Sequence, residues 1–352
     1  MQKFEYVFDG QILNNIWQVK KIEKDTGCFV PFQTDLTEYK KNLLDREVNL
    51  ATDYDLEYAK YLRATKNYIR LFYSGGSDSH NILTKFVDNN IFLDEIVVMT
   101  RNLYNNKTLQ SCDQEILEQA IPYLQTLTSK QVGAIVFKNY DAGYMKKLYE
   151  DPRWMFSVPG GDVGFRIMQL FEYMQADNNK ADCQIVGKEK PLLLQYNDKW
   201  YATITDGTLI DTASLHNVCM FYLMPENIKS FVAKARSMRA NLSDPILAPD
   251  QKFKFYKDAI TSDYTKNIGK YANNGKSLLN IKDRRALSEA AMYGDVEVIT
   301  KWLRSIEELK QEFPELVDGY DLQRYPAGKF PFFLDIDSLE IFSQHELIPN
   351  GF

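Results

Sequence analysis

The feature of this chain that most constrains its fold is a glycine-rich loop between a strand and a helix. Residues 74–79 read Ser-Gly-Gly-Ser-Asp-Ser. Before the loop, residues 68–73 form a short run of β-branched and aromatic side chains, which predicts a buried strand. After it, residues 79–88 carry apolar side chains at the spacing of one helical face, which predicts an amphipathic helix.

The chemistry of this loop favours a bound anion such as pyrophosphate. Adjacent glycines allow positive φ angles and let an anion approach the backbone amides closely. The start of the following helix adds free N–H groups and the positive end of the helix dipole. Three serines supply hydroxyl donors, and Asp78 supplies a carboxylate for magnesium. The alternative is a simple Gly-Gly turn in which Ser79 caps the helix.

The six residues match the PP-loop pattern Ser-Gly-Gly-x-Asp-Ser, and in this stretch the chain resembles the ATP pyrophosphatases. That family includes asparagine synthetase, GMP synthetase and 7-cyano-7-deazaguanine synthase. The resemblance covers residues 66–195 and implies an adenine nucleotide alpha hydrolase-like (HUP) core that binds ATP and Mg²⁺. It also implies that Asp78 is both a catalytic residue and a metal ligand. The cofactor-binding residues that it implies in the loop are Ser74, Gly75, Gly76, Ser77, Asp78 and Ser79.

From residue 66 onward the pattern alternates between strands and helices, which predicts an α/β fold with a parallel sheet covered on both faces. We expect an N-terminal extension over 1–65, a PP-loop ATP-binding domain over 66–215 and a mostly helical region over 216–352. The expected strands are 4–8, 16–19, 68–73, 94–100, 133–137 and 184–186, and the expected helices include 55–62, 79–88, 110–124 and 164–175. The apolar segment 331–342 is expected to cover a core or bind a second subunit.

A second candidate loop follows the strand at 184–186. Ligands in parallel sheets bind beyond the carboxyl ends of the strands, and residues 187–191 (Gly-Lys-Glu-Lys-Pro) lie at that edge. Gly187 and Lys188 are therefore expected to contact the nucleotide, with Lys188 neutralising the leaving pyrophosphate as a catalytic residue. Glu189 is expected to join Asp78 on the metal. The alternative is a solvated charged turn.

Two further segments complete the expected site. By the family resemblance, Thr100 and Arg101, at the end of the second strand of the unit, lie where adenine is held. Residues 158–165 (Val-Pro-Gly-Gly-Asp-Val-Gly-Phe) open a helix and are read equally well as a substrate loop or as a capped turn. His80 lies in the first turn of the loop helix, where a packing or surface role is expected rather than a role as a base.

Composition narrows the setting of the chain. A net charge of −6 over 352 residues gives no sign of a broad nucleic-acid surface. The four cysteines are scattered and form no Cys-x-x-Cys pair, which favours a reducing cytoplasm over a zinc site or a disulfide scaffold. No signal peptide and no run of about 20 apolar residues is present, so we expect a cytoplasmic protein without a membrane partner. These cysteines are Cys28, Cys112, Cys183 and Cys219.

These observations predict an ATP pyrophosphatase that forms AMP. A substrate carboxylate or amide oxygen is expected to attack the α-phosphorus and release pyrophosphate, and a nitrogen nucleophile then displaces AMP. The adenylated partner, a small molecule or a macromolecule, is not identified by the sequence, and a homodimer is possible. One alternative is a non-catalytic, regulatory nucleotide-binding subunit. Another is a PP-loop sulfur transferase, which the unpaired cysteines disfavour.

Overall fold

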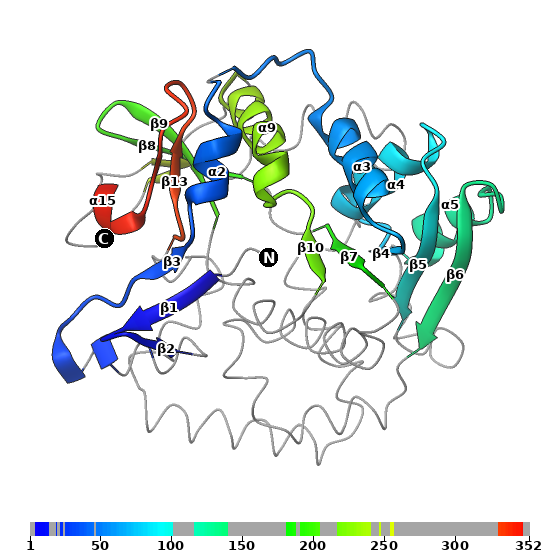
Figure 1. Cartoon of the computed structure of the whole chain (residues 1–352), viewed down its shortest axis with the longest axis horizontal. Coiled ribbons are helices and arrows are strands. Elements are labelled where there is room, and N and C mark those ends of the chain that lie inside the picture. Colours follow the sequence, from blue (N-terminus) through cyan, green and yellow to red (C-terminus); the bar gives the residue numbers. More distant parts are fainter. Residues whose placement is uncertain are drawn as a thin grey trace.

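Three sheets and the helices packed against them form the part of the chain that is described by a computed structural model (Figure 1). One sheet is parallel and forms the centre of an α/β unit, whereas the other two are antiparallel. The described residues are 4–13, 19, 22–23, 25–45, 47–100, 116–139, 181–187, 191–204, 217–240, 246–247, 254–256 and 330–347.

The helices and strands have the following bounds. The strands are β1 (Phe4–Phe8), β2 (Gln11–Leu13), β3 (Phe32–Thr34), β4 (Ile69–Phe72), β5 (Leu93–Thr100), β6 (Val132–Asn139), β7 (Cys183–Val186), β8 (Leu192–Tyr196), β9 (Lys199–Thr203), β10 (Val218–Met220), β11 (Ile246–Leu247), β12 (Lys254–Tyr256), β13 (Phe333–Asp335) and β14 (Ile341–Phe342). The helices are α2 (Thr37–Asn42), α3 (Tyr54–Thr65), α4 (Ser77–Val87), α5 (Ile121–Leu124), α9 (Ile228–Ala240) and α15 (Gln344–Leu347), with a π-helical turn over Ile116–Ala120.

The parallel sheet confirms the α/β architecture that the sequence predicts. Its strand order is β10-β7-β4-β5-β6, and every neighbouring pair is parallel. This topology is consistent with a Rossmann-like or HUP-type core. The strands expected at 68–73, 94–100, 133–137 and 184–186 all form, and β10 adds a fifth strand at one edge.

Helices α3 and α4 pack against the parallel sheet and against each other (Figure 1). The carboxylate of Asp53 accepts a hydrogen bond from the amide of Leu56 and so caps the start of α3. Helix α4 buries the apolar face that its sequence predicts. The buried residues of this face are Ile82, Leu83, Phe86 and Val87.

The other two sheets are antiparallel and share a core with the ends of β4 and β7. The N-terminal sheet has the order β2-β1-β3, and the larger sheet has the order β11-β12-β8-β9-β13-β14. The sequence analysis missed the β8–β9 hairpin. Its turn residues Asn197 and Asp198 have φ values of 47° and 61°, as the common two-residue hairpin turn requires. Two apolar runs separated by Asn-Asp were the signal that could have revealed it.

Helix α9 lies between the two larger sheets and contacts α2, α3, β8 and β9 (Figure 1). The segment after Phe330 returns to the same core through β13, where Phe332, Phe333 and Leu334 are fully buried. The apolar segment expected at 331–342 therefore covers a core. The described part of 216–352 contains short strands as well as α9 and α15, and a mostly helical C-terminal region stays a prediction.

One local prediction in the N-terminal extension is wrong. A strand was expected at 16–19, but Val19 is helical, and residues 16–18 lie outside the described part of the chain. Val19 is fully buried in a cluster with Tyr6 and Val30, so its β-branched side chain serves packing rather than strand pairing. The expected helix at 55–62 and strand at 4–8 are both present.

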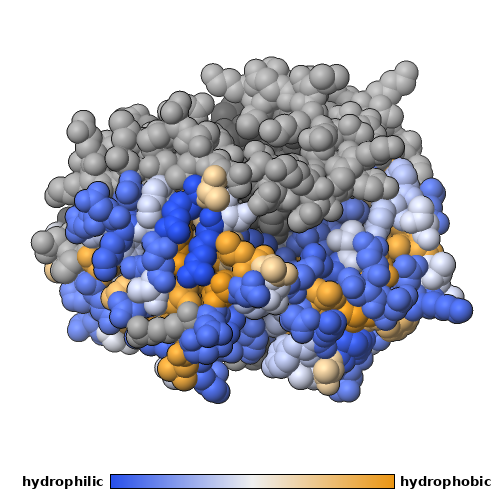
Figure 2. Space-filling view, turned by 90° about the horizontal axis from the view of Figure 1, so that it is seen from above, coloured by the Kyte–Doolittle hydropathy of each residue, from blue (hydrophilic) through white to orange (hydrophobic). Residues whose placement is uncertain are grey.

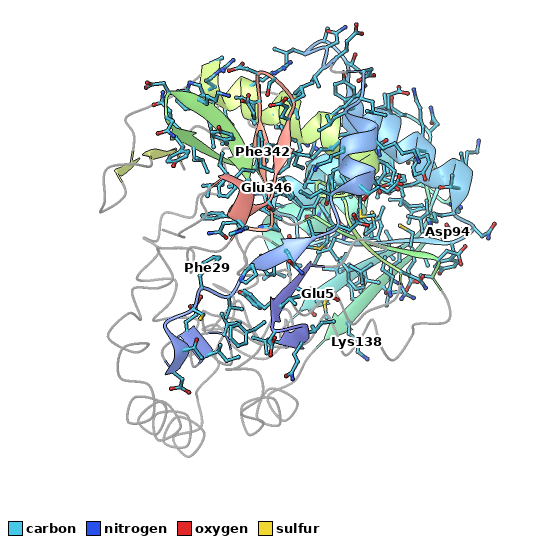
Figure 3. All side chains as sticks on the ribbon, turned by 60° about the vertical axis from the view of Figure 1, so that its left-hand side comes forward. Glu5, Phe29, Asp94, Lys138, Phe342 and Glu346 are labelled. Carbon is cyan, nitrogen blue, oxygen red and sulfur yellow. The ribbon has the colours of Figure 1, made fainter. Side chains whose placement is uncertain are left out.

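Hydrophilic side chains dominate the described part of the face shown in Figure 2, where apolar side chains form separate small patches. None of the helices in the described part of the chain has the length and apolar character of a membrane span. Figure 3 shows Asp94, near the amino end of β5, and Lys138, near the carboxyl end of β6, far apart along the parallel sheet.

Candidate functional site

The loop between β4 and α4 adopts the strand–loop–helix geometry that the sequence predicts. Gly75 is buried and has a φ of +81°, a conformation that L side chains rarely adopt. Gly76 is extended and forms the N-cap of α4 without a side-chain capping bond. The amide of His80 donates to the carbonyl oxygen of Gly76 at 2.9 Å and closes the first helical turn. The backbone thus turns sharply and presents the start of a helix at the carboxyl end of β4.

Serine hydroxyls hold this loop in shape. The amide of Ser74 donates to Oγ of Ser79 at 3.2 Å, and the two hydroxyls are also 3.2 Å apart. The amide of Gly76 donates to Oγ of Ser74 at 3.3 Å, and the Ser79 hydroxyl donates to the carbonyl oxygen of Gly76 at 3.2 Å. Ser74 and Ser79 therefore brace the turn from within. The side chain of Ser77 lies outside the described set.

The structure places Gly187, the first residue of the second predicted loop, against the start of α4. Strand β7 is the direct neighbour of β4, and Val186 pairs with Phe72 at their carboxyl ends. A Cβ atom at Gly187 would lie 3.1 Å from both Cα and N of Ser79 and 3.0 Å from Cδ1 of Ile82. Only a glycine fits this approach without a shift of the helix start. Lys188 and Glu189 lie outside the described residues.

Strand β5 reaches the same edge of the sheet on the other side of β4. It continues three residues beyond Val97, the partner of Phe72, and ends at Thr100. Thr100 is buried, and its hydroxyl lies 3.5 Å from the carbonyl oxygen of Lys138. Its backbone therefore lies at the carboxyl edge of the sheet, the edge that also carries the loop at 74–79, and its contact with adenine stays a prediction. Arg101 and the candidate loop at 158–165 lie outside the described residues.

Asp78 occupies the first turn of α4 and is half-buried. Its backbone carbonyl oxygen accepts a hydrogen bond from the hydroxyl of Tyr222 at 2.8 Å. Its carboxylate attracts the ammonium of Lys234 and tends to raise the pKa of that lysine. Within the described residues, no group of three or more His, Cys, Asp or Glu side chains is arranged to hold a metal. Of the two predicted metal ligands, Asp78 and Glu189, only Asp78 lies in the described part of the chain.

Behind Asp78 lies a buried polar cluster that the sequence analysis missed. Asp55, on α3, accepts hydrogen bonds at both carboxylate oxygens, and Nζ of Lys234 lies 2.9 and 2.7 Å from Oδ1 and Oδ2. Its other donors are the amide of Asn81 at 3.0 Å, the amide of Asn227 at 3.3 Å and the hydroxyl of Ser230 at 2.6 Å. These residues come from α3, α4, α9 and the turn before α9, so the cluster joins all three helices beside the loop.

The geometry of the cluster is that of a buried ion pair. Burial alone would raise the pKa of Asp55, but the charge of Lys234 and the hydrogen bonds to the carboxylate outweigh it and hold that pKa below its ordinary value. Burial lowers the pKa of Lys234, and the charges of Asp55 and Asp78 only partly oppose this. The sequence signal was weak: Asp55 and Lys234 are charged residues on otherwise apolar helical faces.

His80 is packed under the loop. A hydrogen bond of 2.9 Å joins Nδ1 of His80 to the hydroxyl of Tyr73, and the ring of Tyr123 meets the imidazole edge-on at 4.6 Å between centroids. Burial lowers the pKa of His80, which favours the neutral ring. His80 is 3% exposed, so the expected packing role is confirmed, whereas the expectation that it does not act as a base stays a prediction.

A pocket of about 950 Å³ lies at the amino ends of β7 and β10, whereas the loop at 74–79 lies at the carboxyl end of β4. Cys183 and Cys219 line it from neighbouring strands, and their buried thiols contact each other although the sequence analysis treated Cys183 as isolated. The hydroxyl of Tyr58 lies 3.4 Å from Sγ of Cys219. The hydrogen bond with Cys219 and burial raise the pKa of the Cys183 thiol, which disfavours the reactive thiolate.

Models of known protein families give no match to this chain. A search of curated proteins finds no match either. The geometry of the loop and its surroundings is therefore the basis for assigning a function.

Proposed function

We propose that this protein is a PP-loop ATP pyrophosphatase that adenylates a carboxylate or amide oxygen of its substrate. The observation that carries the proposal is the hexad at 74–79 at the carboxyl end of a central parallel strand, with Gly187 packed against its helix start. The positive φ of Gly75 turns the chain so that the start of α4, with its free amides, follows directly on the carboxyl end of β4, and Gly187 packs against that helix start.

The proposed reaction breaks the α–β phosphoanhydride bond of ATP. The loop amides would hold the β- and γ-phosphates, which leaves the α-phosphorus open to the substrate oxygen. As the new O–P bond forms, pyrophosphate leaves with the electron pair of the broken bond. Asp78 supplies an oxygen ligand suited to Mg²⁺, and the charge of that ion would neutralise the developing charge on pyrophosphate. A nitrogen nucleophile can then displace AMP from the adenylate.

Lys188 and Glu189 are further candidate site residues, because they follow Gly187 directly in the sequence, after the carboxyl end of β7. A lysine there would add positive charge beside the leaving group, and a glutamate would add a second ligand for the metal. Sulfur transfer is less well supported. Cys183 and Cys219 are buried at the opposite edge of the sheet, and the exposed Cys28 lies in the N-terminal extension.

The decisive experiment follows α-labelled ATP with Mg²⁺ and a panel of carboxylates and amides. Labelled AMP together with pyrophosphate is expected for a true substrate. Label in ADP, or tight ATP binding without turnover for every compound, would instead favour a kinase or a regulatory nucleotide-binding subunit.

Asp78→Ala tests the site itself. We expect turnover to fall by about 10²- to 10³-fold, because the metal and pyrophosphate would lose a fixed charged ligand. Asp88→Ala, an exposed carboxylate at the other end of α4, is the matched control and should keep normal turnover. Equal activity in the Asp78 variant and the wild type would remove Asp78 from the mechanism.

A further inference from the structure

The hydroxyl of Tyr222 links the buried cluster to the nucleotide loop. It donates to the carbonyl oxygen of Asp78 at 2.8 Å and accepts a hydrogen bond from the amide of Asn81 at 3.1 Å. Asp78 and Asn81 are neighbours on one face of α4, one turn apart. A single buried hydroxyl thus makes hydrogen bonds to two successive turns at the start of the helix, and Tyr222 itself is 1% exposed.

The ion pair lies against the ring of Tyr222. Nζ of Lys234 lies 4.0 Å from the centroid of the Tyr222 ring, a cation–π contact. The same ammonium is held by both oxygens of Asp55 and by the hydroxyl of Ser230 at 2.9 Å. Asp55 also accepts the Asn81 amide that donates to Tyr222. Asn81 and Lys234, two polar side chains that contact the tyrosine, are therefore both held by Asp55.

The polar cluster fixes the relative positions of its partners in addition to holding the three helices together. Burying an ion pair is costly, and apolar side chains of the same volume would hold three helices together at least as well. Hydrogen bonds, unlike apolar contacts, specify where each partner must lie. What this polar cluster adds is a defined position for the carbonyl of Asp78, in the turn whose amides would meet phosphate.

We propose that Tyr222 is a positioning residue for the nucleotide loop, and that the Asp55–Lys234 ion pair orients it. The assignment of this turn to phosphate rests on the proposed function, whereas its fixation by Tyr222 does not. Tyr222 follows β10 and Lys234 lies on α9. Residues beyond 216, outside the stretch that resembles the ATP pyrophosphatases, therefore take part in shaping the loop.

Tyr222→Phe tests the proposal by removing only the hydroxyl. Tyr39→Phe is a matched control, because Tyr39 is also fully buried and its hydroxyl donates to a neighbouring carbonyl, that of Leu223, at 2.5 Å. Both variants should lose similar stability. Only Tyr222→Phe should raise the KM for ATP, by about 5- to 10-fold with kcat little changed, because ground state and transition state use the same cradle.

Hydrogen exchange provides a readout that needs no nucleotide. The amides of residues 81 and 82 close the first turns of α4, and they should exchange faster in Tyr222→Phe than in Tyr39→Phe or the wild type. Equal protection in the two variants would overturn the positioning role. Failure of the wild type to bind ATP, together with faster exchange in Tyr222→Phe, would instead refute the proposed function and leave the positioning role standing.

A double-mutant cycle tests the contribution of the ion pair. Lys234→Met should raise the KM for ATP in the same direction, and combining it with Tyr222→Phe should add less than the sum of the two effects. Tyr39→Phe combined with Lys234→Met should be additive. Full additivity in the Tyr222 cycle would show that the ion pair does not orient the tyrosine. If Lys234→Met does not fold, the same cycle is measured with Lys234→Gln, which keeps hydrogen-bonding groups and removes the charge.

Discussion

Among the residues that the structure describes, two ion pairs in the α/β unit have contrasting surroundings. Arg70 and Glu95 face each other on β4 and β5, in direct register and 0% and 1% exposed. Asp55 and Lys234 join α3 and α9 beside the loop. The first pair connects strands that the hydrogen-bonded ladder already fixes. The second connects two helices through side chains alone, so a change in this pair can shift the helices and the loop beside them.

The partners of the sheet pair stay within the sheet. The guanidinium of Arg70 donates to Glu95 at 2.9 and 3.0 Å and to Gln184 on β7 at 3.1 Å, and the hydroxyl of Tyr68 donates to Glu95 at 2.9 Å. These bonds run across β5, β4 and β7. The helix pair instead leads through Tyr222 to the backbone of the loop. Similar chemistry therefore supports register in one region and loop position in the other.

The largest expected effect comes from breaking either pair. Arg70→Met should lower the free energy of unfolding by about 3–5 kcal/mol, because the carboxylate of Glu95 would remain buried without its partner. Lys234→Met should cost somewhat less, since its side chain is 16% exposed. Urea denaturation measures both. Among folded molecules, only the Lys234 variant should show a raised KM for ATP, and an equal rise in the Arg70 variant would remove the contrast between the regions.

A smaller effect is expected from two glycines at opposite edges of the parallel sheet. A Cβ at Gly187 would press on Ser79, whereas a Cβ at Gly133 would lie 2.7 Å from the carbonyl oxygen of Asp94. Either alanine substitution should destabilise the fold by about 1–3 kcal/mol through overpacking. Only Gly187→Ala should weaken ATP turnover. Comparable turnover in the two variants would show that the helix start tolerates displacement.

The smallest expected effect is the pH dependence of stability that comes from His80 on α4. Burial holds the pKa of His80 below its ordinary value of 6.5 in the folded protein, so the unfolded chain binds the proton first as the pH falls. Stability should therefore decrease as the pH falls through 6.5 toward the folded-state pKa. His80→Asn should reduce this slope in urea titrations. An unaltered slope in the His80 variant would rule out His80 as its source.

The sequence alone determined the elements whose signals are local. The six loop residues, the apolar strand before them and the helical spacing after them lie within 21 residues (68–88), and the structure forms β4, the loop and α4 there. Alternation of strands and helices likewise predicted the parallel sheet, because such units have few topological solutions. The hairpin at Asn197 has a local signal in its Asn-Asp turn that was overlooked, whereas Val19 is helical because packing outweighs the strand preference of its β-branched side chain.

Only the tertiary structure decided which distant residues support the loop. Asp55 and Lys234 are 179 residues apart, and Tyr222 lies between them in the sequence. Each of the three by itself looks like an ordinary side chain on a helix or after a strand. Their hydrogen bonds exist because α3, α4 and α9 meet beside β4. Sequence spacing reports periodicity within one element, whereas contacts between elements depend on how apolar faces pack. The loop could be found from its own residues, and the side chains that hold it could not.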